Sequence, residues 1–357
     1  MQLIQLLYLF GRPFSPIYGL CMHLREKLYK SGLFATYAFN VPVISVGNLT
    51  MGGSGKTPTV EAVAQLLLAA GYRPAVISRG YKGTSSQQMN LVSDGQSVMM
   101  DVKNAGDEPV MLARALPSVP VLTGRKRFYP CKYAVKKLGC TALVLDDGFQ
   151  HLAIRRDINL TLFNATTLAG NSRVFPGGEL REPISALFRS DAFVITGVNQ
   201  KNSDRSQRFA ELLQKKYESK PVYFMENVLA GIYTQQNEEI AIDKLPKDLL
   251  AFSGIAHPQR FHDQLVACNI PIAGAVLFPD HVLYGPLEIE RLISVARKNR
   301  VNGLITTEKD FVKLEKTDLP FHLFYLKMKT ELPESLQLQI LQAFEMMTTN
   351  RFSKMKL

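Results

Sequence analysis

The segment from Thr50 to Thr57 is the feature that most constrains how this chain can fold. It reads Thr-Met-Gly-Gly-Ser-Gly-Lys-Thr. An apolar run at 41–46 precedes it and predicts a buried strand, and a helical pattern with apolar residues at positions 60, 63, 64, 67 and 68 follows it. Strand, glycine-rich turn and helix in this order are typical of a P-loop, whose backbone amides bind phosphate. The sequence therefore predicts a nucleotide-binding α/β fold.

This loop differs from the Walker A pattern at one position. Thr50 stands where G-x-x-x-x-G-K-[ST] has its first glycine. We expect ATP phosphates to lie against a cradle of four residues, Gly52, Gly53, Ser54 and Gly55. Lys56 would reach the β- and γ-phosphates, and the hydroxyl of Thr57 would bind Mg²⁺.

Further apolar runs alternate with helical segments along the chain. Those at 74–78, 119–122, 142–145, 158–163 and 192–196 predict the remaining strands of a mostly parallel sheet flanked by helices. The composition turns polar around 200 to 240, where we place a boundary between a P-loop nucleotide-binding domain at 41–225 and a smaller α/β domain at 226–357. The smaller domain has strand candidates at 249–252, 273–278, 303–306 and 321–326 and a last helix at about 333–347.

The first 40 residues predict an amphipathic helical segment. Apolar residues recur at three- and four-residue steps from Leu3 to Leu28. Pro13 and Pro16 predict a break at 11–14 and a second helix with Ser15 as its N-cap. These helices either lie in a membrane interface or pack on the core, and the pattern leaves both open. No uninterrupted apolar run approaches the roughly 18 residues needed to span a bilayer.

The net charge narrows the class of partner. With 42 Lys and Arg against 31 Asp and Glu, the formal charge is +11, which favours an anionic partner such as a phosphosugar, a membrane surface or a nucleic acid. Basic clusters are short and carry no zinc-finger or RRM pattern, so nucleic acid is disfavoured. The four cysteines form no CxxC pair, and the N-terminus lacks a secretory signal, so we expect a protein of the reducing cytosol.

A second element completes the expected nucleotide site. The apolar run at 142–145 ends in Asp146 and Asp147, which is the layout of a Walker B strand that brings a carboxylate to Mg²⁺. Phosphoryl transfer also needs a group that orients the acceptor and cations around the transferred phosphoryl. Candidates from loops near glycine or proline are Arg79, Tyr81, Asp107, Glu108, Arg125, Arg127, His151, Arg181, Glu182 and His281. From the residues alone, Asp107 and Asp147 cannot be ranked as the base.

Taken together, the motifs resemble one family, the tetraacyldisaccharide 4'-kinases of lipid A biosynthesis. The segments that carry the resemblance, in the family's order, are GNLTMGGSGKTP at 47–58, SRGYKG at 78–83, GDEP at 106–109, LDDGFQH at 145–151, LREP at 180–183, FPDH at 278–281 and TTEKD at 306–310. They span most of the chain. The first and fourth are specific by themselves, and Thr50 in place of a glycine is itself similar to the family.

The resemblance implies transfer of the γ-phosphate of ATP to the 4'-hydroxyl of tetraacyldisaccharide 1-phosphate, a glycolipid, at the cytoplasmic face of the inner membrane. It implies that Asp107 is the catalytic carboxylate and that His281 pairs with it, while Lys56 keeps its P-loop role. Asp146, Asp147, Glu182 and Thr57 are the expected metal residues. Substrate or transition-state roles fall to Arg79, Tyr81, Arg125, His151 and Arg181. No obligatory protein partner is expected.

Two alternatives share the P-loop. A GTPase or ATPase switch, or a metal-insertion chaperone, would usually carry [NT]-K-x-D or a Cys/His cluster, whereas the nearest string here is Thr307-Glu308-Lys309-Asp310. A soluble small-molecule kinase would leave the amphipathic N-terminus unexplained. Phosphate transfer to an added glycolipid, as opposed to hydrolysis stimulated by a protein partner, would distinguish the enzyme from the switch.

Overall fold

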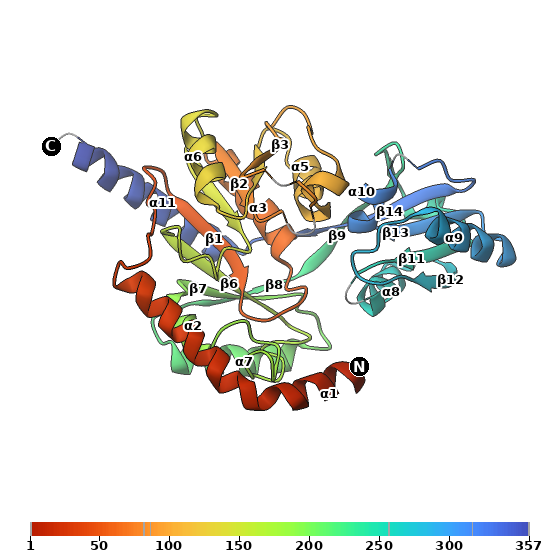
Figure 1. The fold of residues 1–357 in the computed structure, drawn as a ribbon. Coiled ribbons are helices and arrows are strands. Elements are labelled where there is room, and N and C mark those ends of the chain that lie inside the picture. The colour runs from red at the N-terminus through yellow and green to blue at the C-terminus, as the bar shows by residue number, and fades with distance from the viewer. Residues whose placement is uncertain (1, 81–82, 86, 256–257, 316, 356–357) are drawn as a thin grey trace.

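The computed structural model describes residues 2–80, 83–85, 87–255, 258–315 and 317–355 (Figure 1). Tyr81, one of the expected substrate residues, lies outside these ranges. The described chain forms two units, each built on its own sheet. We call them the large unit and the small unit.

The large unit is built on a sheet of eight strands in the order β3-β4-β2-β5-β1-β6-β7-β8. The strands are β1 (Val43–Asn48), β2 (Pro74–Ser78), β3 (Asn90–Ser93), β4 (Val121–Thr123), β5 (Ala142–Asp146), β6 (Ile158–Asn164), β7 (Ala192–Thr196) and β8 (Val222–Met225). Every pairing is parallel except that of β3 with β4. Strands β1, β2, β5, β6 and β7 are buried at every position, which explains their continuous apolar runs. The predicted mostly parallel sheet is confirmed.

Helices cover both faces of this sheet. On one face lie α3 (Lys56–Ala69), α5 (Asp107–Ala115) and α11 (Glu334–Met355), and on the other α6 (Phe128–Lys136) and α7 (Ser203–Lys216). Short helical pieces α4 (Val102–Ala105) and η2 (Ile184–Arg189) fill connections.

The C-terminal helix α11 corrects one expectation. We predicted that the last helix belongs to the smaller domain, but Leu336, Ile340 and Phe344 are fully buried in the core of the large unit. The chain therefore returns to the large unit after the small one is complete. Hydrophobic periodicity predicts a helix but does not say which apolar surface the helix will cover.

The small unit has a sheet of six strands in the order β10-β9-β14-β13-β11-β12. The strands are β9 (Asn227–Thr234), β10 (Glu239–Ile240), β11 (Leu249–Ser253), β12 (Ile272–Leu277), β13 (Gly303–Thr307) and β14 (His322–Thr330). Its helices are η3 (Ile242–Lys244), α8 (Pro258–Ala267), α9 (Pro286–Lys298) and α10 (Glu308–Leu314). Strands β11 to β14 pair in parallel, while β9 and β10 are antiparallel additions at one edge.

Two neighbouring strands connect the units. β8 ends at Met225 and β9 begins at Asn227, and β14 runs back beside β9 until Thr330 pairs with Asn227. A second contact joins the units through helices, since Arg114 at the end of α5 forms an ion pair with Glu315 after α10. Figure 1 shows α10 of the small unit facing α5 of the large one.

The N-terminal segment runs along the outside of the large unit as α1 (Gln2–Gly11), η1 (Arg12–Phe14) and α2 (Ser15–Lys30) (Figure 1). The expected break is a 3-10 turn that holds Pro13. The prediction of Ser15 as N-cap is wrong, because Phe14 already has helical dihedrals and precedes the first residue of α2. Ser15 instead donates from its hydroxyl to the carbonyl of Val174 at 2.7 Å and accepts from the Gly177 amide at 2.9 Å. Among the described helices, none is both long and apolar enough to cross a membrane.

Candidate active site

The P-loop follows β1 and is held by hydrogen bonds from side chains to its backbone carbonyls. Gly55 has φ +75°, and a Cβ there would lie 3.1 Å from the Thr196 hydroxyl oxygen, so this position requires glycine. The Thr196 hydroxyl donates to the carbonyl of Ser54 at 2.9 Å. Asn48 donates from its side-chain amide to the Thr50 carbonyl at 2.7 Å, which holds the loop where Walker A has a glycine.

The loop has the features of a phosphate site. Its amides precede the first turn of α3, where the helix N-terminus favours negative charge. The hydroxyl of Ser54 is buried and makes no hydrogen bond within the described chain. A buried hydroxyl without a partner is costly unless a ligand satisfies it. The P-loop residues therefore fit ATP, with Gly52, Gly53, Ser54 and Gly55 as the cradle.

Lys56 faces the Walker B-like aspartates at the end of β5. Its ammonium lies 3.3 Å from the amide oxygen of Asn48 and 3.6 Å from a carboxylate oxygen of Asp147. Arg181 donates to both oxygens of Asp147, at 3.0 and 2.8 Å. Burial alone would raise the pKa of Asp147, but the charges of Lys56 and Arg181 lower it to about 2. Asp147 is therefore ionised at neutral pH.

Asp146 has a different environment from its neighbour. Its side chain is buried at the end of β5 and accepts a hydrogen bond from the Ser78 hydroxyl at 3.0 Å. Burial raises the pKa of Asp146 to about 6, and the negative charges of Glu108 and Asp147 add to the effect. A divalent cation would relieve this accumulation of negative charge. Glu108, which the sequence did not single out as a metal residue, contributes to the negative electrostatic potential at Asp146.

Thr57, Asp146 and Asp147 fit the requirements for Mg²⁺ in a nucleotide site. In the described part of the chain, no three His, Cys, Asp or Glu side chains come close enough together to hold a metal ion by themselves. Mg²⁺ in ATP sites usually takes one or two carboxylates and completes its shell with phosphate and water. The hydroxyl of Thr57 in the first turn of α3 and the carboxylates at the end of β5 and just after it suit that pattern.

Arg127 is a site residue that the sequence did not separate from its neighbours. Its guanidinium is buried and donates to the carbonyl of Asp147 at 2.9 Å and to that of Asp146 at 2.5 Å. It therefore fixes the backbone that presents both carboxylates. Arg125 and Arg79, which were expected to act on substrate, are exposed. A run of Arg-Lys-Arg at 125–127 does not reveal which guanidinium points inward.

Asp107 and His281 are brought together across the two units. Gly106, with φ +94°, precedes Asp107 at the start of α5. The Asp107 carboxylate lies 2.8 Å from Nδ1 of His281, which is located in the loop after β12. The other ring nitrogen, Nε2, lies 3.2 Å from the ammonium of Lys309. A neutral imidazole that donates from Nδ1 and accepts at Nε2 satisfies both contacts.

The charge state of Asp107 follows from these neighbours. Burial would raise its pKa, but the hydrogen bond from His281 and the charge of Lys309 hold the pKa well below the usual range of a carboxyl group. Asp107 is therefore ionised and able to accept a proton or a hydrogen bond.

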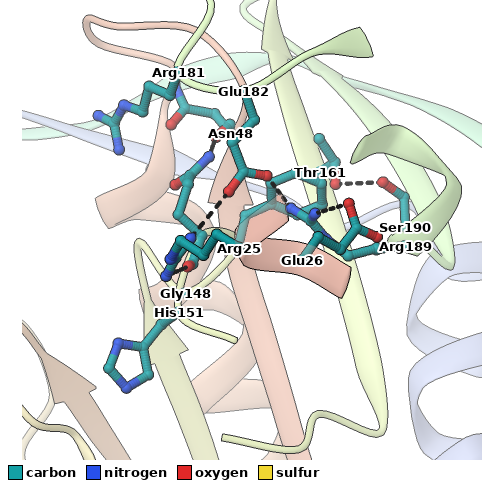
Figure 2. A network of polar contacts seen from close by, with 12 residues as sticks. Arg25, Glu26, Asn48, Gly148, His151, Thr161, Arg181, Glu182, Arg189 and Ser190 are labelled. Atoms are coloured by element: carbon teal, nitrogen blue, oxygen red, sulfur yellow. Dashed lines mark hydrogen bonds and ion pairs between the residues drawn. The ribbon is translucent and has the colours of Figure 1, made fainter. Parts of the chain in front are cut away.

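Glu182 is not arranged as a metal ligand, contrary to the expectation from the resemblance. One of its carboxylate oxygens lies 3.5 Å from Arg25 on α2, and the other forms a close ion pair with Arg189 (Figure 2). Arg189 also binds Glu26 of α2 at 3.1 Å. The buried Glu182 therefore anchors the N-terminal helix to the large unit, while its neighbour Arg181 turns to Asp147.

His151 lies after β5 with its ring pointing away from the Glu182 ion pairs (Figure 2). Burial lowers the pKa of His151 to about 3, and the guanidinium groups of Arg127 and Arg156 add to the effect. Its Nε2 is buried and makes no hydrogen bond in the described chain. A neutral imidazole among guanidinium groups is an environment in which an anionic or hydroxyl-rich ligand would be stabilised.

Comparison with known proteins decides which P-loop family this geometry belongs to. The family model described as tetraacyldisaccharide-1-P 4'-kinase matches residues 7–345. The chain belongs to this family. The tetraacyldisaccharide 4'-kinase of Desulfotalea psychrophila is 45% identical over 324 residues, which cover 90% of this chain and 93% of that protein. That of Geobacter metallireducens is 40% identical over 303 residues, covering 83% and 86%.

A solved structure of the tetraacyldisaccharide kinase family agrees with the fold. The crystal structure of LpxK from Aquifex aeolicus in complex with ATP is similar with a TM-score of 0.74 at 31% identity, covering 93% of this chain and 98% of that chain. The motif order read from the sequence is thus that of a family with this two-unit architecture.

Proposed function

We propose that this chain transfers the γ-phosphate of ATP to the 4'-hydroxyl of tetraacyldisaccharide 1-phosphate, giving lipid IVA. The observation that carries the proposal is the contact between Lys56 of the P-loop and Asp147 after β5, in a chain that belongs to the kinase family. The juxtaposition of Asp107 and His281 supports it, because phosphoryl transfer to an alcohol also needs a proton acceptor.

In the proposed mechanism, this chain's residues hold the reactants and accept the proton. The P-loop amides and Lys56 would bind the phosphates. Thr57, Asp146 and Asp147 would hold Mg²⁺, which when bound would neutralise charge on the transferred phosphoryl group. Asp107 accepts the proton of the acceptor hydroxyl. The oxygen of that hydroxyl bonds to the γ-phosphorus, and the bond between the γ-phosphorus and the leaving ADP oxygen breaks. His281 keeps the carboxylate oriented by its hydrogen bond.

We further propose that the protein binds the cytoplasmic face of the inner membrane through α1, η1 and α2. The large apolar side chains exposed on this segment are Leu6, Leu7, Leu9, Phe10, Phe14, Ile17, Leu20 and Leu24. Three polar residues of α2, Ser15, Tyr18 and Arg25, face the protein and bond to the large unit, while Lys27 and Lys30 are exposed. A helical segment that exposes large apolar side chains together with lysines suits a lipid surface, and the net charge of +11 favours anionic headgroups.

The decisive experiment incubates the purified protein in detergent with γ-labelled ATP, Mg²⁺ and tetraacyldisaccharide 1-phosphate. We expect label in the lipid, and we expect Lys56→Ala to reduce the rate by at least about 100-fold, since a cation at the transferring phosphate supplies several kcal/mol. If only free phosphate is released, and GTP or a protein partner changes that release, a switch function replaces the kinase proposal.

A further inference from the structure

Three side chains of the small unit, two lysines and the imidazole of His281, converge on one oxygen of Asp107. Nδ1 of His281 lies 2.8 Å from Oδ2, the ammonium of Lys313 lies 3.5 Å away and that of Lys309 lies 3.9 Å away. The other oxygen, Oδ1, accepts the amide of Glu108 on the large unit's own α5 at 3.0 Å. Position and charge of the carboxylate thus depend on groups from both units.

Lys313 differs from Lys309 in how firmly it is held. The Lys313 side chain is only 3% exposed and forms an ion pair with Asp310 at 3.2 Å. The Lys309 side chain is 20% exposed and pairs with Asp280, which is itself 38% exposed. A buried ammonium with a fixed partner has few alternative positions, whereas a surface lysine has many.

The partner of Lys313 is itself immobilised. Asp310 is completely buried and accepts the amide of Gly254 at 2.8 Å and the hydroxyl of Thr307 at 3.0 Å. Thr307 caps α10 by accepting the Asp310 amide at 3.2 Å. The ring of Tyr284 lies 5.9 Å from the Lys313 ammonium. Lys313 therefore sits at a defined point at the edge of the small unit.

We propose that Lys313 is a positioning residue that draws the Asp107 carboxylate into its reactive orientation when the small unit contacts the large one. This inference rests on the proposed role of Asp107 as proton acceptor. Lys313 is balanced by Asp310 within its own unit, and it gains a second carboxylate only across the interface. Among the causes that act on Asp107, burial raises its pKa, and His281, Lys309 and Lys313 lower it.

The test measures single-turnover phosphoryl transfer to the lipid for Lys313→Met, Lys313→Arg and Asp107→Asn. We expect Lys313→Met to lower the rate constant by about 10- to 100-fold, a part of the 10²- to 10⁴-fold typical of a positioned base. The KM for ATP should stay within about twofold, because Lys313 acts on the proton acceptor and not on nucleotide binding. Lys313→Arg should recover most of the rate, since it restores the charge. Lys298→Met, an exposed lysine at the end of α9, serves as the matched control and should leave the rate unchanged.

A double-variant comparison with Asp107 distinguishes a positioning role of Lys313 from a general structural effect of its replacement. In an Asp107→Asn background, Lys313→Met should cause no further loss, because the two act through one group. Independent, multiplying losses would overturn the proposal, as would a rate for Lys313→Met within twofold of the native one. If Asp107→Asn itself keeps the native rate, the assigned role of Asp107 fails and the Lys313 inference falls with it. Should Lys313→Met not fold, Lys313→Met/Asp310→Asn removes the buried pair together and is expected to show the same loss.

Discussion

At the scale of single residues, the site separates neighbouring carboxylates by their surroundings. Asp147 has a pKa of about 2 because two cations overcome its burial, whereas Asp146, with a pKa of about 6, is buried next to other negative charges. Pairs of titratable groups whose environments drive their pKa values apart are typical of catalytic sites. Asp107 belongs with Asp147 in this respect, since its ionised form is stabilised by groups of the small unit.

His281 provides the residue-scale prediction. Replacing His281 with Ala removes the 2.8 Å hydrogen bond to Asp107, and we expect kcat to fall by about 10- to 1,000-fold. The KM for ATP should change little, because the P-loop is untouched. Steady-state kinetics with the lipid acceptor measure both constants. His322→Ala, at an exposed position on β14, is the matched control, and equal losses in the two variants would contradict the prediction.

At the scale of elements, the N-terminal helices expose large apolar side chains and hold two ion-paired side chains of α2 against the large unit. Arg25 and Glu26 of α2 form ion pairs with Glu182 and Arg189 of the large unit, so these two charged side chains pack inward. Phe10 and Phe14 are 69% and 60% exposed. The alternative left open by the sequence, an apolar face packed on the core, is therefore wrong for these side chains.

Replacing Leu7, Phe10 and Phe14 together with Ser should reduce membrane binding. Full burial of such side chains stabilises by about 1.5 to 3 kcal/mol each, so an incompletely inserted set still predicts at least about a tenfold loss of vesicle affinity. Sedimentation with vesicles of phosphatidylethanolamine and phosphatidylglycerol measures the change. Leu338→Ser/Met346→Ser on α11 removes equally exposed apolar groups and should bind like the native protein. Unaltered sedimentation of the triple variant would count against a membrane role for these helices.

At the scale of the whole molecule, charged groups meet where the units face each other. Glu61 on α3, the helix after the P-loop, interacts electrostatically with Glu308 of α10 and Lys327 of β14. Glu308 and Lys327 form an ion pair of 3.7 Å. Burial raises the pKa of Glu61 from an ordinary 4.5 to about 7, and the negative charge of Glu308 adds to this shift. The positive charge of Lys327 and a hydrogen bond from Gln65 oppose it.

The raised pKa of Glu61 predicts a pH dependence of stability with a defined sign. Between pH 4.5 and about 7 the folded protein holds a proton that the unfolded chain has released, so this group's contribution to stability decreases as the pH rises through that window. Glu61→Gln should remove this decrease. The free energy of unfolding of the variant minus that of the native protein should therefore be about 1 to 3 kcal/mol larger at pH 8 than at pH 5. Urea unfolding at both pH values tests this. Glu218→Gln, at an exposed site on the large unit, is the control, and an equal pH response in native protein and Glu61→Gln would refute the prediction.

The sequence by itself determined the parts whose chemistry is local. A P-loop uses consecutive backbone amides and the first turn of one helix, so the glycine turn at Gly55 and the helix that begins at Lys56 could be predicted directly. Fully buried parallel strands require continuous apolar runs, and the predictions at 74–78 and 192–196 have the bounds of β2 and β7. The edge strands β3 and β10 were not predicted, because strands of four and two residues are too short to show a clear apolar pattern.

Only the tertiary structure decided what depends on distant partners. Asp107 and His281 are separated by 174 positions, and only the family resemblance could suggest that they pair. Arg127 and Arg125 are two positions apart, yet one is buried behind Asp146 and the other is exposed. Glu182 lies beside Arg181 in the chain, but it forms ion pairs with Arg25 and Arg189 and does not join the expected metal residues. Charge and hydrogen-bond partners are set by side-chain direction and by packing between elements, and neither is encoded in local spacing.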